Sequence, residues 1–135
     1  MKPQDKIIVV EDDPSMLQAI NRLLRAAGFC PVAFPSAEAL LESGAASEAV
    51  CFILDIRLPG SSGVELQQRL AAGGIDRPVI FITGSDSPSA RQATAACHPV
   101  AYLTKPFAAK NLLAAIGRAL NRTIGNPDST LPEES

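Results

Sequence analysis

Residues 50–60 read VCFILDIRLPG: an apolar run, a single carboxylate at Asp55, and a Pro-Gly turn. The run Val50–Leu54 is short, continuously apolar and rich in residues that suit a pleated surface. It therefore predicts a β-strand that is buried on both faces. Asp55 would lie at the carboxyl end of this strand, which is the edge where ligands bind in open α/β sheets. Alone, an Asp at such a position more often caps a turn, so the neighbouring strands decide its interpretation.

Further apolar runs share the character of this strand, at residues 7–10, 32–34, 79–82 and 100–103. A segment whose apolar residues recur at helical spacing follows each run. Strands that alternate with helices and are apolar on both faces indicate a parallel sheet with helices on each side. We predict a flavodoxin-like α/β fold, (βα)5, with a doubly wound five-stranded parallel sheet in the order 2-1-3-4-5.

Polar residues mark where the predicted helices begin. Asp13, which precedes a proline, is interpreted as a helix N-cap in preference to a metal ligand. Ser62 and Glu65 have the spacing of a capping box. Residues 61–63 read SSG and are interpreted as a turn, because no Lys-Ser/Thr pair follows to make a phosphate loop.

Composition limits the class of protein. A chain of 135 residues with 47% hydrophobic residues, 4% aromatic residues and no Trp predicts one domain with an aliphatic core. Its net charge of −2 and pI of about 5.3 argue against a nucleic-acid-binding surface. We expect residues 1–122 to form the domain and the Pro-, Ser- and Glu-containing residues 123–135 to form a flexible acidic tail.

The three cysteines have no CxxC spacing, so neither a zinc site nor a disulfide framework is indicated. Cys51, inside a predicted strand, is interpreted as a small buried hydrophobe. The polar start shows no signal peptide, and no stretch approaches the roughly 20 apolar residues of a membrane span. We therefore expect a soluble, cytoplasmic protein that makes no membrane contact.

The predicted strand ends bring a set of chemical groups to one edge of the sheet. They are Glu11 and Asp12, Asp55, Thr83, and Lys105. Three converging carboxylates repel one another and raise one another's pKa values, and Lys105 is the only fixed cation among them. The set therefore calls for a divalent ion, and its hard oxygen ligands favour Mg²⁺, with Mn²⁺ as the alternative.

This combination suits phosphoryl transfer. A metal ion and Lys105 would neutralise the phosphoryl oxygens, and Thr83 would donate a hydrogen bond to one of them. Asp55 would be the nucleophile, and it needs no general base because a carboxylate is already ionised near neutral pH.

The chain resembles the receiver domains of two-component response regulators. The resemblance covers residues 7 to about 120 and rests on five motifs in register. These are Val9-Val10-Glu11-Asp12-Asp13, Leu54-Asp55-Ile56-Arg57-Leu58-Pro59, Gly63 with Glu65-Leu66, Ile82-Thr83-Gly84 and Tyr102-Leu103-Thr104-Lys105-Pro106-Phe107. The segments DIRLPG and LTKPF are most similar to FixJ-type receivers.

The resemblance implies a role for each matching residue. Asp55 would accept the phosphoryl group, which Thr83 and Lys105 would contact. Asp12, Asp55 and the backbone carbonyl of Arg57 would ligate Mg²⁺, and Glu11 would act mainly through water. The resemblance also implies a cis peptide bond between Lys105 and Pro106.

Tyr102 would be the switch residue, turning inward as Thr83 moves toward the phosphoryl group; simple core packing of Tyr102 is the alternative. The output surface would be the fourth helix, the fifth strand and the fifth helix. One departure from the family pattern is His98-Pro99, where receivers usually carry Gly-Ala. A Gly there supplies a left-handed helix stop, so this difference concerns the end of the fourth helix. His98 is expected to be a solvent-exposed residue at that helix end.

The implied partners are a sensor histidine kinase or phosphotransfer protein and a downstream protein target or fused output domain. A homodimer that forms on phosphorylation is a further expectation. The domain would phosphorylate and dephosphorylate itself as a signalling module and would not be a turnover enzyme. Because no DNA-binding segment follows Arg122, we expect a stand-alone receiver; the isolated receiver of a longer DNA-binding regulator is the alternative.

Three other functions fit the sequence less well. A phosphatase of the haloacid dehalogenase type needs a second acid two residues after its nucleophile, where this chain has Arg57. A pseudo-receiver, which binds partners without phosphorylation, usually lacks one of the acids, the Thr or the Lys, and this chain has them all. A flavin carrier is disfavoured because aromatic residues are scarce and no phosphate loop is recognisable.

Overall fold

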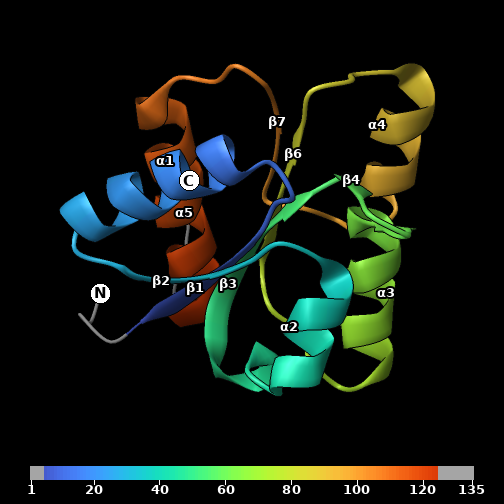
Figure 1. Ribbon diagram of the computed structural model, residues 1–135, viewed down its shortest axis with the longest axis horizontal. Coiled ribbons are helices and arrows are strands. Elements are labelled where there is room, and N and C mark those ends of the chain that lie inside the picture. The colour runs from blue at the N-terminus through green and yellow to red at the C-terminus, as the bar shows by residue number, and fades with distance from the viewer. Residues whose placement is uncertain (1–4, 125–135) are drawn as a thin grey trace.

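The computed structural model describes residues 5–124, and side chains up to residue 121. Five parallel strands form one sheet (Figure 1), with the bounds β1 Lys6–Val10, β2 Cys30–Phe34, β3 Ala49–Asp55, β6 Val79–Thr83 and β7 Ala101–Thr104. Their order is β2-β1-β3-β6-β7. With β6 and β7 as the fourth and fifth main strands, this is the predicted order 2-1-3-4-5, and the flavodoxin-like fold is confirmed.

A helix follows each of these strands. The helices are α1 Pro14–Ala26, α2 Ala37–Ser43, α3 Gly63–Ala72, α4 Pro88–Ala95 and α5 Ala109–Ile124, and a 3-10 turn, η1 Ala46–Glu48, precedes β3. Helices α1 and α5 cover one face of the sheet, and α2, α3 and α4 lie on the other side (Figure 1). Within residues 5–124, no helix has the length and apolar character that crossing a membrane requires.

Strand alternation divides the core into two halves. In β3, Ile53 packs in the cluster with α1 and α5, whereas Phe52 and Leu54 pack in the cluster with α2 and α3. All three side chains are at most 1% exposed. Because successive strand residues point to opposite faces, this continuous apolar run satisfies both halves at once, as the sequence predicted.

The predicted helix caps are present. Asp13 Oδ1 accepts a hydrogen bond from the Ser15 N–H at 3.0 Å, which confirms its role as the α1 cap. Ser62 Oγ accepts from the Glu65 N–H, and Glu65 Oε1 accepts from the Ser62 N–H, which confirms the capping box. These contacts satisfy N–H groups that the first turn of a helix leaves without intrahelical partners.

The prediction that residues 61–63 form a turn is wrong, because Ser61–Ser62 form a short strand and Gly63 begins α3. Residues Arg57–Leu58 (β4) pair antiparallel with Ser61–Ser62 (β5). Gly60, at φ 68°, supplies the left-handed residue that this tight connection needs. The small hairpin leads directly into α3.

Helix α4 differs from the others in what it buries. Among its residues, only Thr94 is buried, while Ala93, one of its apolar positions, is exposed. The Thr94 hydroxyl donates to the main-chain oxygens of Ala90 and Arg91, so it carries no unsatisfied group into the interior.

At the other end of the chain, α5 continues to Ile124, two residues past the expected domain boundary. The expected acidic tail falls mostly on residues 125–135, which lie outside the described residues.

Candidate functional site

The carboxyl ends of the strands bring Glu11, Asp55, Thr83 and Lys105 to one edge of the sheet, as predicted. Lys105 Nζ lies 2.7 Å from Glu11 Oε1 and 3.0 Å from Asp55 Oδ2. The Lys105 N–H donates to the Thr83 carbonyl at 2.7 Å. The Lys105–Pro106 peptide bond is cis, as the family resemblance implies. One ammonium group therefore joins two carboxylates that come from different strands.

Asp55 is buried and held at both oxygens. Its residue is 4% exposed. Oδ1 accepts the Arg57 N–H at 3.0 Å, and Oδ2 accepts from Lys105 Nζ. The first bond arises because the chain turns sharply after β3, which brings the amide of Arg57 back toward the carboxylate. The Arg57 side chain itself is exposed. Two donors from two directions fix the plane of the Asp55 carboxylate.

Glu11 is fully buried beside Asp55. Its Oε2 accepts the Asp13 N–H at 2.9 Å. Its Oε1 lies within ion-pair distance of Lys105, but among the described residues no hydrogen bond of good geometry reaches this oxygen. Burial raises the pKa of Glu11, as does the charge of Asp55, and both outweigh the lowering effect of Lys105 and the Asp13 N–H. The buried carboxylates of Glu11 and Asp55 therefore have fewer positive charges and hydrogen-bond donors around them than two ionised carboxylates need.

Lys105 remains positively charged in this environment. Burial alone would lower its pKa, but its close ion pair with Glu11, its hydrogen bond to Asp55 and the charges of both carboxylates more than compensate, so its pKa is raised. The ammonium is a permanent positive charge at neutral pH.

Three carboxylates at this edge are close enough to hold one metal ion. One oxygen each from Glu11, Asp12 and Asp55 lies within 4.8 Å of the others. Glu11 and Asp55 are buried, whereas Asp12 is exposed toward solvent. The under-bonded Glu11 oxygen and the excess of carboxylates over cations both fit a hard divalent cation. A surface cleft of about 420 Å³ opens here, lined by Asp12, Asp55, Arg57, Leu58, Pro59, Gly84, Ser85 and Lys105.

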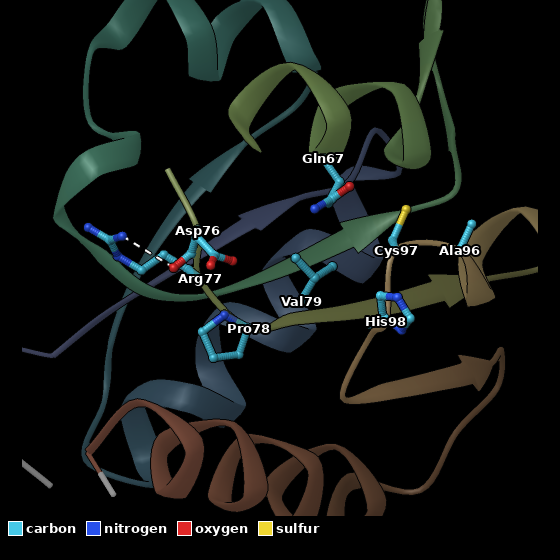
Figure 2. Close-up of a pocket in the computed structure, with 8 residues that line it drawn as sticks. All are labelled: Gln67, Asp76, Arg77, Pro78, Val79, Ala96, Cys97 and His98. Carbon is cyan, nitrogen blue, oxygen red and sulfur yellow. Dashed lines mark hydrogen bonds between the residues drawn. The ribbon is translucent and has the colours of Figure 1, made fainter. Parts of the chain in front are cut away.

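A second, larger hollow has a volume of about 760 Å³, and Figure 2 shows the residues that line it. It is formed by α3, the start of β6 and the segment after α4, and it includes Gln67, Cys97 and His98. Arg77 lines this hollow and donates to the main-chain oxygens of Ser47 and Ala49. Its guanidinium group therefore connects the segment before β6 to η1 and the start of β3. The hollow shares no lining residue with the carboxylate cleft.

Thr83 and Tyr102 lie on neighbouring strands. Thr83 is 1% exposed, and its Oγ1 accepts the Ser85 N–H at 3.0 Å. Phe81 of β6 pairs with Tyr102 of β7. Tyr102 and Phe81 both pack in the core half that faces α2 and α3. The structure therefore brings the two predicted switch residues to the same part of the molecule.

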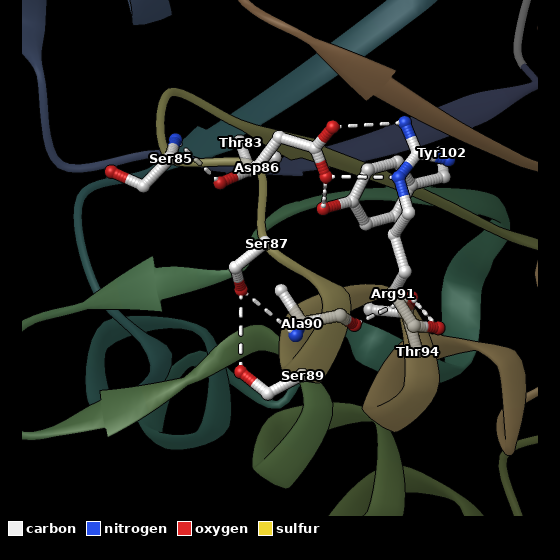
Figure 3. Close-up of polar contacts among 9 residues, drawn as sticks. All are labelled: Thr83, Ser85, Asp86, Ser87, Ser89, Ala90, Arg91, Thr94 and Tyr102. Carbon is white, nitrogen blue, oxygen red and sulfur yellow. Dashed lines mark hydrogen bonds and ion pairs between the residues drawn. The ribbon is translucent and has the colours of Figure 1, made fainter.

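Sequence reasoning missed two residues that contact Tyr102 (Figure 3). The Tyr102 hydroxyl donates to Asp86 Oδ1 at 2.8 Å. Arg91 donates two hydrogen bonds to Asp86, and its guanidinium carbon lies 4.5 Å from the centre of the Tyr102 ring. Asp86 and Arg91 are five residues apart across the start of α4, which is not a spacing that patterns of helical ion pairs detect.

Comparison with known proteins identifies the family. The family model described as "Response regulator receiver domain" matches residues 7–117. Nodulation protein W of Bradyrhizobium diazoefficiens is 42% identical over 117 residues, which cover 86% of this chain and 51% of that protein. The transcriptional regulatory protein FixJ of the same species is 34% identical over 123 residues, which cover 90% of this chain and 60% of FixJ.

Among solved structures, the BeF3-activated DrrB receiver domain is similar with a TM-score of 0.79 at 28% identity, covering 88% of this chain and 99% of that one. The chain spans about half the length of these curated relatives. Its matched segment, its fold and its relatives agree: the chain belongs to the receiver-domain family of two-component response regulators, and FixJ is one of its relatives.

Proposed function

We propose that Asp55 is the phosphoryl acceptor of this receiver domain. The observation that carries the proposal is the geometry of its carboxylate. It is buried, opens on the cleft, and is fixed by the Arg57 N–H and the Lys105 ammonium. A carboxylate held in one orientation is prepared for in-line attack on a phosphorus atom, because little of its rotational freedom remains to be lost.

The donor in this proposal is the phosphohistidine of a sensor histidine kinase or phosphotransfer protein. A bond forms between an Asp55 oxygen and phosphorus as the donor's P–N bond breaks, and the departing imidazole takes a proton from solvent. Lys105 then neutralises part of the charge on the phosphoryl oxygens, and the Thr83 hydroxyl donates a hydrogen bond to one of them.

The residues that would hold the metal ion are Asp12 and Asp55 directly, the backbone carbonyl of Arg57, and Glu11 mainly through water. Carboxylate and carbonyl oxygens are ligands suited to Mg²⁺, with Mn²⁺ as a substitute. When bound, such an ion supplies positive charge to the phosphoryl oxygens. Glu11, with its raised pKa and under-bonded Oε1, gains the most from this compensation.

Phosphorylation would then be transmitted to the surface of α4, β7 and α5. Thr83 and Tyr102 are the proposed switch pair, and they lie next to the start of α4. This surface would control a downstream protein, a fused output domain or a second copy of the chain. The proposed setting is a cytoplasmic signalling pathway in which the domain is not a turnover enzyme. Direct contact with nucleic acid or with a membrane is not part of the proposal.

The test is the intact mass of the protein after incubation with acetyl phosphate, with and without Mg²⁺. We expect wild type to gain the mass of one phosphoryl group only with Mg²⁺, and Asp55→Asn to gain none. Asp13→Asn is the matched control, because Asn also caps a helix well and Asp13 is not a proposed acceptor. A folded wild-type protein that binds Mg²⁺ but gains no mass would contradict the proposal and favour a phosphorylation-independent binding module.

A further inference from the structure

Asp86, Arg91 and Tyr102 form a closed cluster of contacts at the start of α4, here called the Tyr102 latch (Figure 3). Arg91 Nε and Nη2 donate to the two Asp86 oxygens at 2.9 and 3.0 Å. The Tyr102 hydroxyl donates to Asp86 Oδ1, and the Arg91 guanidinium lies over the Tyr102 ring. Each member of the latch therefore contacts both of the others.

The closed arrangement makes the latch stronger than an ordinary surface ion pair. The side chains of Arg91 and Asp86 are 58% and 41% exposed, and an isolated pair so exposed contributes little. Here two nitrogens of the Arg91 guanidinium donate to the two carboxylate oxygens of Asp86, which is the favourable geometry for such a pair. The same guanidinium also makes a cation–π contact with the ring. Disturbing one contact weakens the other two.

The latch is connected to Thr83 through a short segment of main chain. The Ser85 N–H donates to Thr83 Oγ1 at 3.0 Å, and Asp86 is the next residue. Movement of the Thr83 hydroxyl toward Asp55 must either break this bond or draw Ser85 with it. If Ser85 moves, then Asp86 moves as well, and Asp86 is the residue that holds the Tyr102 hydroxyl.

We propose that Asp86 and Arg91 are positioning residues that hold Tyr102 in the orientation seen here and thereby oppose the switch that follows phosphorylation of Asp55. This inference rests on the proposed function of Asp55, Thr83 and Tyr102. The latch would stabilise the resting state relative to the switched state and so lower the population of the switched state before phosphorylation. By linkage, a contact that favours the resting state weakens the binding of any phosphoryl analogue to the same extent.

The chain provides its own probe of the latch. Tyr102 is its only tyrosine, and it contains no Trp. Tyrosine emission therefore reports on one side chain, at the centre of the latch. We propose to titrate the full chain with beryllofluoride, an analogue of the phosphoryl group, in the presence of Mg²⁺. The quantity compared is the beryllofluoride concentration at half of the emission change, which does not depend on the starting brightness of each variant.

The latch variants are Arg91→Ala and Asp86→Ala. We expect each to lower the half-saturating concentration about threefold to tenfold, which is the range that one exposed but well-formed contact network supports. Arg91→Lys keeps the charge but loses the guanidinium fork, so we expect an intermediate value. The matched control is Glu48→Ala, which removes another exposed ion pair, with Lys6, far from the latch. Its half-saturating concentration should equal that of wild type.

Thermal unfolding of the same variants separates positioning from a purely structural role. A structural role predicts a lower melting temperature with no gain in beryllofluoride affinity, and that result would overturn the inference. Wild-type affinity in both latch variants would also overturn it while leaving the proposed function of Asp55 intact. Failure of wild type to bind beryllofluoride would overturn both.

Discussion

At the scale of single residues, Lys105 is the group on which the buried carboxylates depend. Its side chain is 19% exposed and contacts the carboxylates of Glu11 and Asp55, which are almost completely buried. A charge left unpaired in such a position is costly, whereas the pair itself adds little net stability. Removing Lys105 should therefore destabilise the protein by more than the small net stability that its ion pairs contribute.

We predict that Lys105→Gln lowers the free energy of unfolding by about 2–3 kcal/mol at pH 7 in the presence of a chelator, because Glu11 and Asp55 lose their cation. Burial already raises the pKa of Glu11 above its ordinary value of 4.5, and removal of Lys105, which lowers that pKa, raises it further, so the charged form of Glu11 disfavours folding more in the variant than in wild type. That cost appears as pH rises through the raised pKa, and it disappears as pH falls. The deficit of Lys105→Gln should therefore shrink between pH 7 and pH 5.

Urea unfolding at both pH values measures this effect. Lys110→Gln is the control, because Lys110 is an exposed residue of α5. Equal stability of Lys105→Gln and wild type at pH 7 would contradict the account of the site.

At the scale of elements, the approach of α3 to the end of β3 positions Asp55. A Cβ built on Gly63 would lie 2.4 Å from the Asp55 carbonyl oxygen, closer than real atoms approach. The Gly63 N–H also donates to the Ile56 carbonyl at 2.8 Å. Only a residue without a side chain lets the first turn of α3 fit against the strand end that carries the proposed acceptor.

We predict that Gly63→Ala lowers the free energy of unfolding by about 1–3 kcal/mol through overpacking, and slows phosphorylation by acetyl phosphate because Asp55 is displaced. Gly117→Ala in α5 is the matched control, since a Cβ there meets nothing within 4 Å. Gly117→Ala should stabilise the protein by about 0.5–1 kcal/mol, because Gly is unfavourable inside a helix. Urea unfolding gives the first effect, and intact mass against time gives the second. Stability changes of the same sign in both variants would contradict the prediction.

The segment after α4 contains a residue with a strained backbone conformation. His98 is exposed and adopts φ 52°, a left-handed conformation that costs a residue with a side chain about 1–2 kcal/mol. We predict that His98→Gly stabilises the protein by about 0.5–1 kcal/mol, after allowance for the greater chain entropy of Gly. Thermal unfolding should therefore give a higher melting temperature for His98→Gly than for wild type. A lower one would mean that the His98 side chain makes a stabilising contact.

The same elements show what the sequence could and could not predict. The strands were predictable because a continuous apolar run satisfies both core halves, and the site followed because parallel strands end at one edge. The exposed His98 at the end of α4 was also predictable from its place in the family pattern. The tight approach of Gly63 was not, because it depends on the angle at which α3 leaves the β4–β5 hairpin. The Tyr102 latch was not predictable either, because Asp86 and Tyr102 are 16 residues apart and meet through side-chain orientation.

At the scale of the whole molecule, the proposed acceptor Asp55 and the proposed switch residues Thr83 and Tyr102 lie on opposite faces of the sheet. Cys51 and Ile53 of β3 pack toward α1 and α5, and by alternation Asp55 continues that side. Phe81 of β6 packs toward α2 and α3, and Thr83 continues that side beside Tyr102. A phosphoryl group on Asp55 would be sensed across the edge of the sheet by Thr83. In the proposed mechanism, this arrangement would connect phosphorylation at buried Asp55 to the exposed surface at α4.

The central claim is that Asp55 itself carries the phosphoryl group, and chemical trapping tests it most directly. An aspartyl phosphate is reduced by borohydride to homoserine, whereas a free carboxylate is not. After incubation with acetyl phosphate and Mg²⁺, borohydride reduction and peptide mass spectrometry should find homoserine at position 55 and at no other acidic residue of the site. Homoserine at position 12 or 13 instead, or a stable phosphoryl group on a serine or threonine, would contradict the account.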